Sequence, residues 1–235
     1  MRALLLIFAL VSPAFADDKP DLGQLLTNPS GAAFSLTDGT VPAKHAVKNV
    51  VGAFASNKKS FWAAGDVVND KGTVDGHASA VWDHDKTGWT LIAYSLVPTT
   101  TAKAIAPPKI ESKNTAGDEY FLTIFDDVWG QDAAETVTKA KDAVLFGSAP
   151  NERFVGGAAM NKALTGWNLK FKIRDGRVTG KTSGRLLWMV ANMDATSGKS
   201  TTPYRVFLVF QGDSDGGYSL VHASFAAMTG HGWGT

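Results

Sequence analysis

The hydrophobic positions of the chain fall into short runs that alternate with polar or glycine-containing segments. In the first part of the chain, three such runs cover residues 61–68, 76–82 and 89–97. They are rich in β-branched and aromatic residues and are separated by Gly, Asp and Asn, which is the composition of strands joined by turns. The pattern therefore predicts three consecutive strands.

One earlier segment shows helical spacing instead. Its apolar residues recur at intervals of three and four: Ala46, Val47, Val50, Val51 and Phe54. Thr40 and Pro42 precede them and suit an N-cap and a first helical turn. This spacing predicts a helix from about residue 42 to residue 56.

The later part of the chain has helical patterns first and strand patterns afterwards. Helical spacing covers residues 119–129, continues over 133–140 and returns over 158–164, with a short strand-like run at 143–146. Four strand candidates then follow one another: 167–173, 185–193, 204–210 and 218–225. Helices followed by a run of strands favour an α+β fold over a parallel α/β sheet.

The amino terminus has the pattern of an export signal. Arg2 precedes an apolar run at residues 3–11, and Ala14-Phe15-Ala16 then forms a small-x-small cleavage site. The run is about half of the roughly 20 residues that a membrane-spanning helix needs. We expect residues 1–16 to be a signal peptide cleaved after Ala16, rather than a buried helix. The mature protein would be periplasmic or secreted, without membrane insertion.

A connector divides the expected mature chain into two halves. Residues 98–117 lack apolar periodicity and are rich in Pro, Thr and Lys. They separate a first half, 17–97, from a second half, 118–228, and residues 229–235 form a flexible tail. Residues 88–96 can be aligned with 217–225 at an offset of 129 positions. This echo indicates an internal duplication, unless two unrelated hairpins merely look alike.

Composition and charge exclude some classes of protein. The chain has no cysteine and is 44% hydrophobic, so its stability must come from a core and not from disulfides. Loss of Arg2 with the signal leaves 22 basic and 22 acidic residues. A neutral balance disfavours nucleic acid as a partner and gives no support to charge-driven membrane docking.

The last hairpin has a distinctive order of residues. Residues 204–210 form an apolar strand, residues 213–217 form an acidic-Gly turn, and His222 stands in the strand that follows. This order resembles the SnoaL-like branch of the NTF2-like superfamily, whose members commonly end with an apolar strand, an acidic-Gly turn and a strand of pattern Gly-Trp-x-hydrophobic-Val-His-x-His-x-Ser. Tyr218 stands where Trp is usual, His222 matches the first His, and Ser224 replaces the second.

The resemblance covers residues 118–228, with residues 17–97 as a shortened copy. It implies two NTF2-like cone-shaped halves, each a curved antiparallel sheet packed on helices, with an apolar pocket between sheet and helices. Members of the superfamily use this pocket for isomerase, dehydratase or cyclase chemistry or for ligand binding, and associate through the outer face of the sheet. The fold alone does not choose among these functions.

His222 is the candidate catalytic residue. Strand alternation places it on one face with Tyr218, Leu220 and Ser224. If that face lines the pocket, the imidazole could act as a general base or as a hydrogen-bond anchor. The alternative is a buried histidine that bonds to a neighbouring strand.

Five residues are candidates for binding a ligand: Tyr218, Ser224, Trp188, Asn192 and Tyr204. Together they would line an aromatic cavity with a few polar anchors, although ordinary core packing explains large aromatic residues in strands equally well. The five histidines show no paired spacing typical of a metal site. We therefore expect neither a metal nor another cofactor.

Three hypotheses about function follow. The leading one is an exported, non-catalytic protein that binds a small apolar ligand or a protein partner through an NTF2-like pocket or sheet. The second is a SnoaL-like isomerase, lyase or hydrolase that uses His222 as general base. The third is a structural protein whose sheet faces pack on each other or form a homodimer.

Overall fold

The computed structural model describes residues 19–28, 32, 34–37, 41–99, 122–123, 125–127, 129–181, 186–212 and 216–228. The expected signal peptide, the tail and nearly all of the connector at 98–117 lie outside the described residues. These three assignments therefore stay predictions.

The first half forms a five-stranded sheet. After a short 3₁₀ helix, η1 (Leu22–Leu26), the strands are β1 (Phe34–Thr37), β2 (Ala46–Phe54), β3 (Ser60–Val68), β4 (Val74–Asp85) and β5 (Gly88–Pro98). Their order in the sheet is β1-β5-β4-β3-β2, and every pairing is antiparallel except that of β1 with β5. The three predicted strands are confirmed as β3, β4 and β5.

The predicted helix at 42–56 is wrong, because this segment is strand β2. Asn49 has a φ of 53°, and the pairing of β2 with β3 shifts register between Lys48 and Val51. This bulge changes which face the following side chains occupy. Val51 packs on the face of this sheet that contacts the six-stranded sheet of the second half, whereas Val47 packs on the opposite face. A strand with apolar residues on both faces thus produced the spacing of a helix.

The second half forms a six-stranded sheet with order β7-β6-β11-β10-β9-β8. Its strands are β6 (Val144–Phe146), β7 (Arg153–Val155), β8 (Lys170–Lys181), β9 (Leu186–Ser197), β10 (Ser200–Gly212) and β11 (Tyr218–Ala227). Helix α2 (Gly157–Trp167) lies between β7 and β8. The helix at 158–164 and the strands at 143–146, 185–193, 204–210 and 218–225 are confirmed, with somewhat different bounds. The strand predicted at 167–173 begins only at Lys170, because Trp167 is the last residue of α2.

The two helices predicted at 119–129 and 133–140 have different outcomes. Residues 122–123 and 125–127 are helical, and the others between 119 and 128 lie outside the described residues. The helix predicted at 133–140 is wrong. This segment is a series of turns that makes a bridge from Val137 to Leu220 of β11 and donates a hydrogen bond from the Thr138 N–H to the Leu220 carbonyl, so pairing with the sheet replaces helical bonding.

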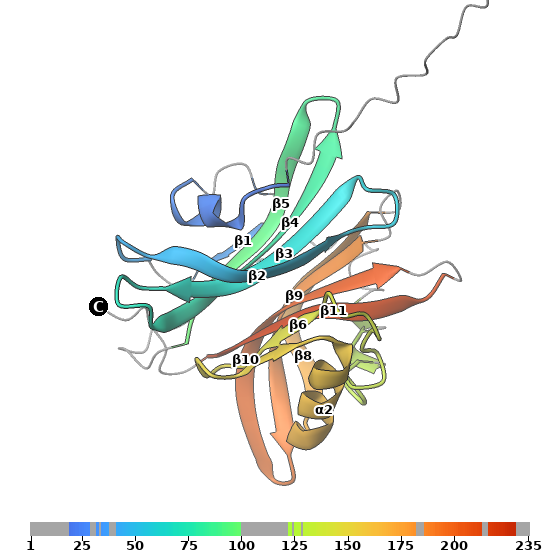
Figure 1. Cartoon of the computed structure of the whole chain (residues 1–235). Coiled ribbons are helices and arrows are strands. Elements are labelled where there is room, and N and C mark those ends of the chain that lie inside the picture. Colours follow the sequence, from blue (N-terminus) through green and yellow to red (C-terminus); the bar gives the residue numbers. More distant parts are fainter. Residues whose placement is uncertain are drawn as a thin grey trace, which may run out of the picture.

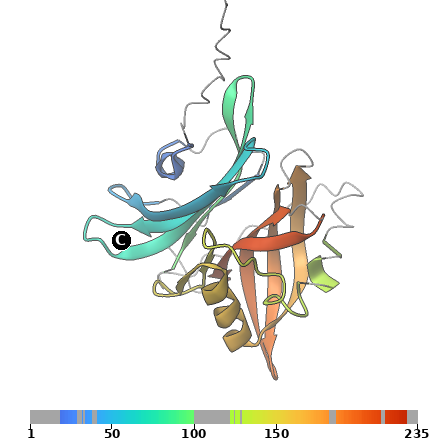
Figure 2. The ribbon, with the colours of Figure 1, turned by 45° about the vertical axis from the view of Figure 1, so that its right-hand side comes forward.

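The two sheets form two layers, and α2 lies against the six-stranded sheet (Figures 1 and 2). Among the described residues, three hydrophobic clusters hold these layers together. The largest lies between α2 and the six-stranded sheet and includes Phe125, Trp129 and Met160. The second lies between the two sheets, where Trp62 of β3 meets residues such as Trp188 of β9. The third covers the far face of the five-stranded sheet. The molecule is therefore a stack in which the two sheets pack directly on each other.

The expectation that each sheet packs on helices is correct only for the second half. Among the described residues of the first half, η1 is the one helical element, and it contributes the buried Leu22 and Leu25. Aromatic side chains fill much of the remaining face, where the rings of Phe61 and Trp82 lie 5.8 Å apart and those of Phe54 and Phe61 lie 4.9 Å apart. Large aromatic residues bury enough surface to cover a sheet face without an α-helix.

The two sheets have corresponding strand arrangements. In each, the last strand pairs in parallel with a short strand, β1 or β6, and antiparallel with the preceding long strand, β4 or β10. Each last strand also carries one bulge residue, Ile92 in β5 and Val221 in β11. These two residues are 129 positions apart, which is the offset of the sequence echo.

Candidate functional site

The bulge in β11 determines where His222 points. Val209 of β10 pairs with His222 and Phe210 pairs with Leu220, so Val221 is an extra residue. Strand alternation is interrupted there, and Leu220 faces the cluster beneath α2 while His222 faces the five-stranded sheet. The prediction that Leu220 and Tyr218 share the face of His222 is therefore wrong, because sequence alternation does not reveal a bulge.

The His222 imidazole bonds to both sheets. Nδ1 lies 2.9 Å from the carbonyl oxygen of Val144 on β6, and Nε2 lies 2.8 Å from Oγ of Ser79 on β4. A carbonyl only accepts, so Nδ1 carries the proton, and the Ser79 hydroxyl then donates to Nε2. This assignment makes His222 a neutral hydrogen-bonded bridge across the interface between the sheets.

A serine hydroxyl on a histidine nitrogen is also the arrangement of a nucleophile and its base. Here His222 is 0% exposed and Ser79 is 1% exposed. The Trp62 ring stacks on the imidazole at 5.6 Å, and burial lowers the pKa of His222 to about 3. A histidine with this pKa is a weak base at neutral pH, and no substrate reaches a side chain enclosed in this way. The geometry therefore favours a structural role for this pair.

A second buried histidine lies in the same interface. His77 of β4 stacks on the Phe146 ring at 4.0 Å, and its Nδ1 is 3.4 Å from Oδ1 of Asp66. Burial lowers the pKa of His77, although Asp66 acts in the opposite direction. Arg153 of β7 connects the other sheet to this pair, since its Nε lies 3.5 Å from Asp66 Oδ2 and its Nη2 donates to the Asn49 carbonyl at 2.8 Å.

The Asp66 carboxylate is held ionised by these neighbours. Burial by itself would raise its pKa, but the neighbouring His77, a hydrogen bond from Asn49 and the charge of Arg153 lower the pKa below its usual value. The Asn49 amide donates to Asp66 Oδ2 at 2.8 Å. Two histidines, one carboxylate and one guanidinium thus cross-link the sheets through a mostly apolar interface.

The other candidate residues occupy different environments. Trp188 is 2% exposed and belongs to the cluster between the sheets. Asn192 is 4% exposed, and its amide donates to the Asp175 carboxylate at 3.0 Å. Ser224 is 2% exposed, whereas Tyr218 is 41% exposed at the start of β11. Of the six residues predicted for a site, Tyr204 is the one that lines the pocket described next.

This pocket opens on the helix side of the six-stranded sheet and has a volume of about 210 Å³. It lies between the end of α2, strands β10 and β11, and the loop that joins β6 to β7. Its lining residues are Gly147, Ser148, Glu152, Trp167, Leu169, Tyr204 and Phe225. The volume is below the roughly 300–1,000 Å³ of sites for drug-sized molecules, so a ligand here would be small.

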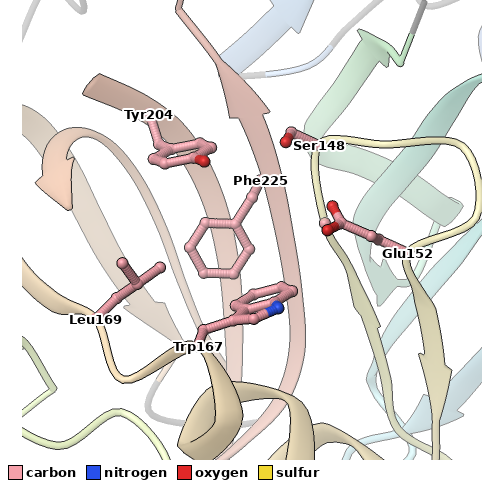
Figure 3. Close-up of a pocket in the computed structure, with 7 residues that line it drawn as sticks. Ser148, Glu152, Trp167, Leu169, Tyr204 and Phe225 are labelled. Atoms are coloured by element: carbon pink, nitrogen blue, oxygen red, sulfur yellow. The ribbon is translucent and has the colours of Figure 1, made fainter. Parts of the chain in front are cut away.

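Three aromatic rings form one side of the pocket (Figure 3). Phe225 is 3% exposed and forms the base. The Trp167 ring lies 5.7 Å from it at an interplanar angle of 89°, and the Tyr204 ring lies 6.1 Å from it, also at 89°. Trp167 ends α2, and Tyr204 and Phe225 come from adjacent strands, so regular elements fix all three rings. The result is an open aromatic box.

The polar side of the pocket faces these rings, with Ser148 and Glu152 across the gap in Figure 3. A compact loop positions Glu152: its carbonyl accepts from the Gly147 N–H at 2.8 Å, and its Oε2 accepts from the Ala149 N–H at 3.0 Å. A Cβ at Gly147 would lie 2.2 Å from Oε2. Glycine at this position therefore allows the carboxylate to fold over the loop toward the pocket.

Sequence reasoning missed Glu152, Ser148 and Trp167 as site residues. The strand pattern at 167–173 includes Trp167, and residues 147–152 show no pattern beyond that of a connection between a strand and a helix. One usable signal was present, since Gly147-Ser148-Ala149-Pro150 directly follows a short buried strand. Loops at strand ends carry binding residues more often than the elements they join.

Two further searches of the described residues gave negative results. No group of three or more His, Asp or Glu residues in the described ranges is arranged to hold a metal ion. In the same part of the chain, no helix has both the length and the apolar character needed to cross a membrane.

Comparison with known proteins finds similarity in structure only. No family model and no curated protein sequence matches the chain. Solved structures that match include an NTF2-like protein of unknown function from Pseudomonas putida, with 14% identity and a TM-score of 0.38 over 49% of this chain and 89% of that chain. Nuclear transport factor 2 from Cryptosporidium parvum matches at 12% identity and a TM-score of 0.35, over 47% and 90%.

ActVI-ORFA from Streptomyces coelicolor also matches, with 12% identity and a TM-score of 0.31 over 46% of this chain and 90% of that chain. Each of these matches spans about half of this chain and concerns the fold alone.

Proposed function

We propose that this chain is an exported, non-catalytic protein that binds a small ligand in the pocket of its second half. The observation that carries the proposal is the aromatic box of Trp167, Tyr204 and Phe225 beside the polar edge at Glu152 and Ser148. A concave apolar site with a few fixed polar groups is the usual form of a small-molecule site. The export component rests on the amino-terminal sequence pattern.

The competing proposal, an enzyme with His222 as general base, has less support. His222 and the pocket lie on opposite faces of β11, because Phe225 packs beneath α2 whereas His222 faces the other sheet. A base must come within hydrogen-bond reach of the proton that it removes. None of the described residues that line the pocket is a histidine, lysine or arginine, so the Glu152 carboxylate has no acid–base partner among them.

We further propose that the two halves arose by duplication and then took different roles. The matched strand orders and the bulges at Ile92 and Val221 support this proposal. The five-stranded sheet covers the face of the six-stranded sheet that lies opposite α2. The first half would serve as a support, and the second half would carry the ligand site.

Ligand binding in the pocket can be tested with a variant whose larger side chain occupies the pocket. Small fragments, neutral and cationic, would be screened against the mature chain by saturation-transfer NMR. Leu169→Trp places a larger side chain in the pocket lining, and Val155→Trp makes the same kind of change at a residue that is 43% exposed. We expect Leu169→Trp to lose fragment binding and Val155→Trp to keep it. Fragments that bind both variants equally, or none that bind the wild type, would refute the proposal.

A further inference from the structure

The chemistry of the pocket also indicates the charge of its ligand. Aromatic rings carry negative potential on their faces, and a cation within about 6 Å of a ring centroid is attracted to it. Trp167 and Tyr204 both stand perpendicular to Phe225. A ligand group in contact with the Phe225 ring would therefore also lie close to the rings of Trp167 and Tyr204.

Glu152 adds a formal negative charge at the open side of this box. Its Oε2 accepts one backbone hydrogen bond, from Ala149. Among the described residues, no lysine, arginine or histidine forms an ion pair with Glu152, whereas Asp66 and Asp75 both have such partners. Burial lowers the pKa of His77, and the charge of Glu152 acts in the opposite direction, but His77 forms its ion pair with Asp66. A carboxylate that is fixed by its loop and has no ion-pair partner among the described residues is suited to a ligand that brings the positive charge.

The neutral part of the lining limits the shape of that ligand. Leu169 and the three rings offer apolar contacts, and Ser148 and Glu152 both line the polar side of the pocket (Figure 3). An ammonium ion that carries methyl or other small alkyl groups matches both sides, since its charge is spread over an apolar surface. A carboxylate or phosphate ligand would be repelled by the Glu152 carboxylate, and none of the described lining residues is basic.

We infer that the pocket binds a small alkylammonium ion, with Trp167, Tyr204 and Phe225 around the alkylated nitrogen and Glu152 as its counter-charge. This inference rests on the proposed function, because it names the ligand class of the same pocket. It assigns Glu152 and the three aromatic residues as specificity-determining residues.

The test compares a cation with a neutral molecule of the same shape. Choline and 3,3-dimethylbutan-1-ol differ in a nitrogen that replaces a carbon, so the difference in their affinities measures the effect of charge. Titration of the mature chain, followed by NMR chemical shifts, should show choline binding at least about tenfold more tightly, which is within the range of cation–π attraction. Added salt should weaken choline binding and leave the alcohol unaffected.

Variants identify the residues responsible. Glu152→Gln keeps the shape of the side chain and should remove most of the preference for choline, and Trp167→Leu should weaken choline binding more than alcohol binding. Glu135→Gln is the matched control, because Glu135 is exposed and lies outside the lining of this pocket. It should behave as wild type.

The outcomes separate this inference from the proposed function. Equal affinity for choline and the alcohol, or a preference that survives Glu152→Gln, would refute the cationic ligand and leave a binding pocket in place. If neither probe binds while neutral fragments are still excluded by Leu169→Trp, the cationic ligand is again refuted and the pocket retained. If no fragment binds either, both proposals fail.

Discussion

Replacement of His222 should change how the stability of the protein depends on pH. The imidazole is fully buried between Ser79 Oγ and the Val144 carbonyl, and burial lowers its pKa to about 3 from an ordinary value near 6.5. The folded state therefore keeps it neutral, while the unfolded state takes up a proton near pH 6.5. The stabilisation is complete above that pH and is lost as the pH falls toward 3.

The magnitude follows from proton linkage. A group that titrates in the unfolded state and not in the folded state changes the free energy of unfolding by about 1.4 kcal/mol per pH unit. Between pH 7 and pH 4, His222 should therefore cost the wild type about 3 kcal/mol. His222→Gln removes this titration and retains an amide that can bond to both partners. The free energy of unfolding of the variant should fall by about 3 kcal/mol less over the same range.

The assay is urea unfolding of both proteins at pH 7, 6, 5 and 4, followed by tryptophan fluorescence, to which Trp62 on the imidazole contributes directly. His77 and Asp66 are present in both proteins, so the difference reports His222 together with its coupling to His77, whose charge, like burial, lowers the pKa of His222. Parallel pH profiles for wild type and variant would refute the argument. An NMR titration that placed the pKa of folded His222 near 6.5 would refute it as well.

Three further substitutions test the packing. Gly166→Ala in α2 meets no atom within 4 Å and should stabilise the protein by up to about 1 kcal/mol in thermal unfolding, because alanine favours helix; a loss of stability would contradict this. Gly157→Ala in the same helix would place its Cβ 1.7 Å from the Thr138 carbonyl oxygen, so it should lower the melting temperature, and an unchanged value would show that the loop yields freely. Ser79→Ala leaves Nε2 of His222 without its hydrogen-bond donor and should lower the free energy of unfolding in urea at pH 7 by about 1–3 kcal/mol. Equal stability of variant and wild type would show that this hydrogen bond contributes nothing.

Sequence patterns predicted the long strands well and the short or bulged elements poorly. Strands β3, β4, β5, β10 and β11 have continuous β-branched and aromatic runs between clear turns. The helix predicted over strand β2 is wrong because a bulge at Asn49 places apolar side chains on both faces of the strand. The apolar residues of β2 therefore recur at intervals of three and four, as they do in a helix. The segment at 133–140 failed for a different reason, since a long-range bridge to β11 decides its conformation.

The candidate site was predictable only in part. Tyr204 was identified because it begins an apolar strand, and it does line the pocket. Glu152 and Trp167 approach Tyr204 only through the folding of three separate segments, and no spacing in the sequence connects them. His222 was placed on the wrong side because one bulge residue, Val221, reverses the alternation after it. A shift of one residue in a strand exchanges its two faces.

The packing of one sheet on the other affects how the assembled molecule responds to dilution. An interface between separate subunits weakens on dilution, because its partners must meet by diffusion. Here both surfaces belong to one polypeptide, so their effective concentration is set by the covalent connection and does not depend on the protein concentration. The support behind the ligand pocket would therefore remain assembled even when single molecules are far apart.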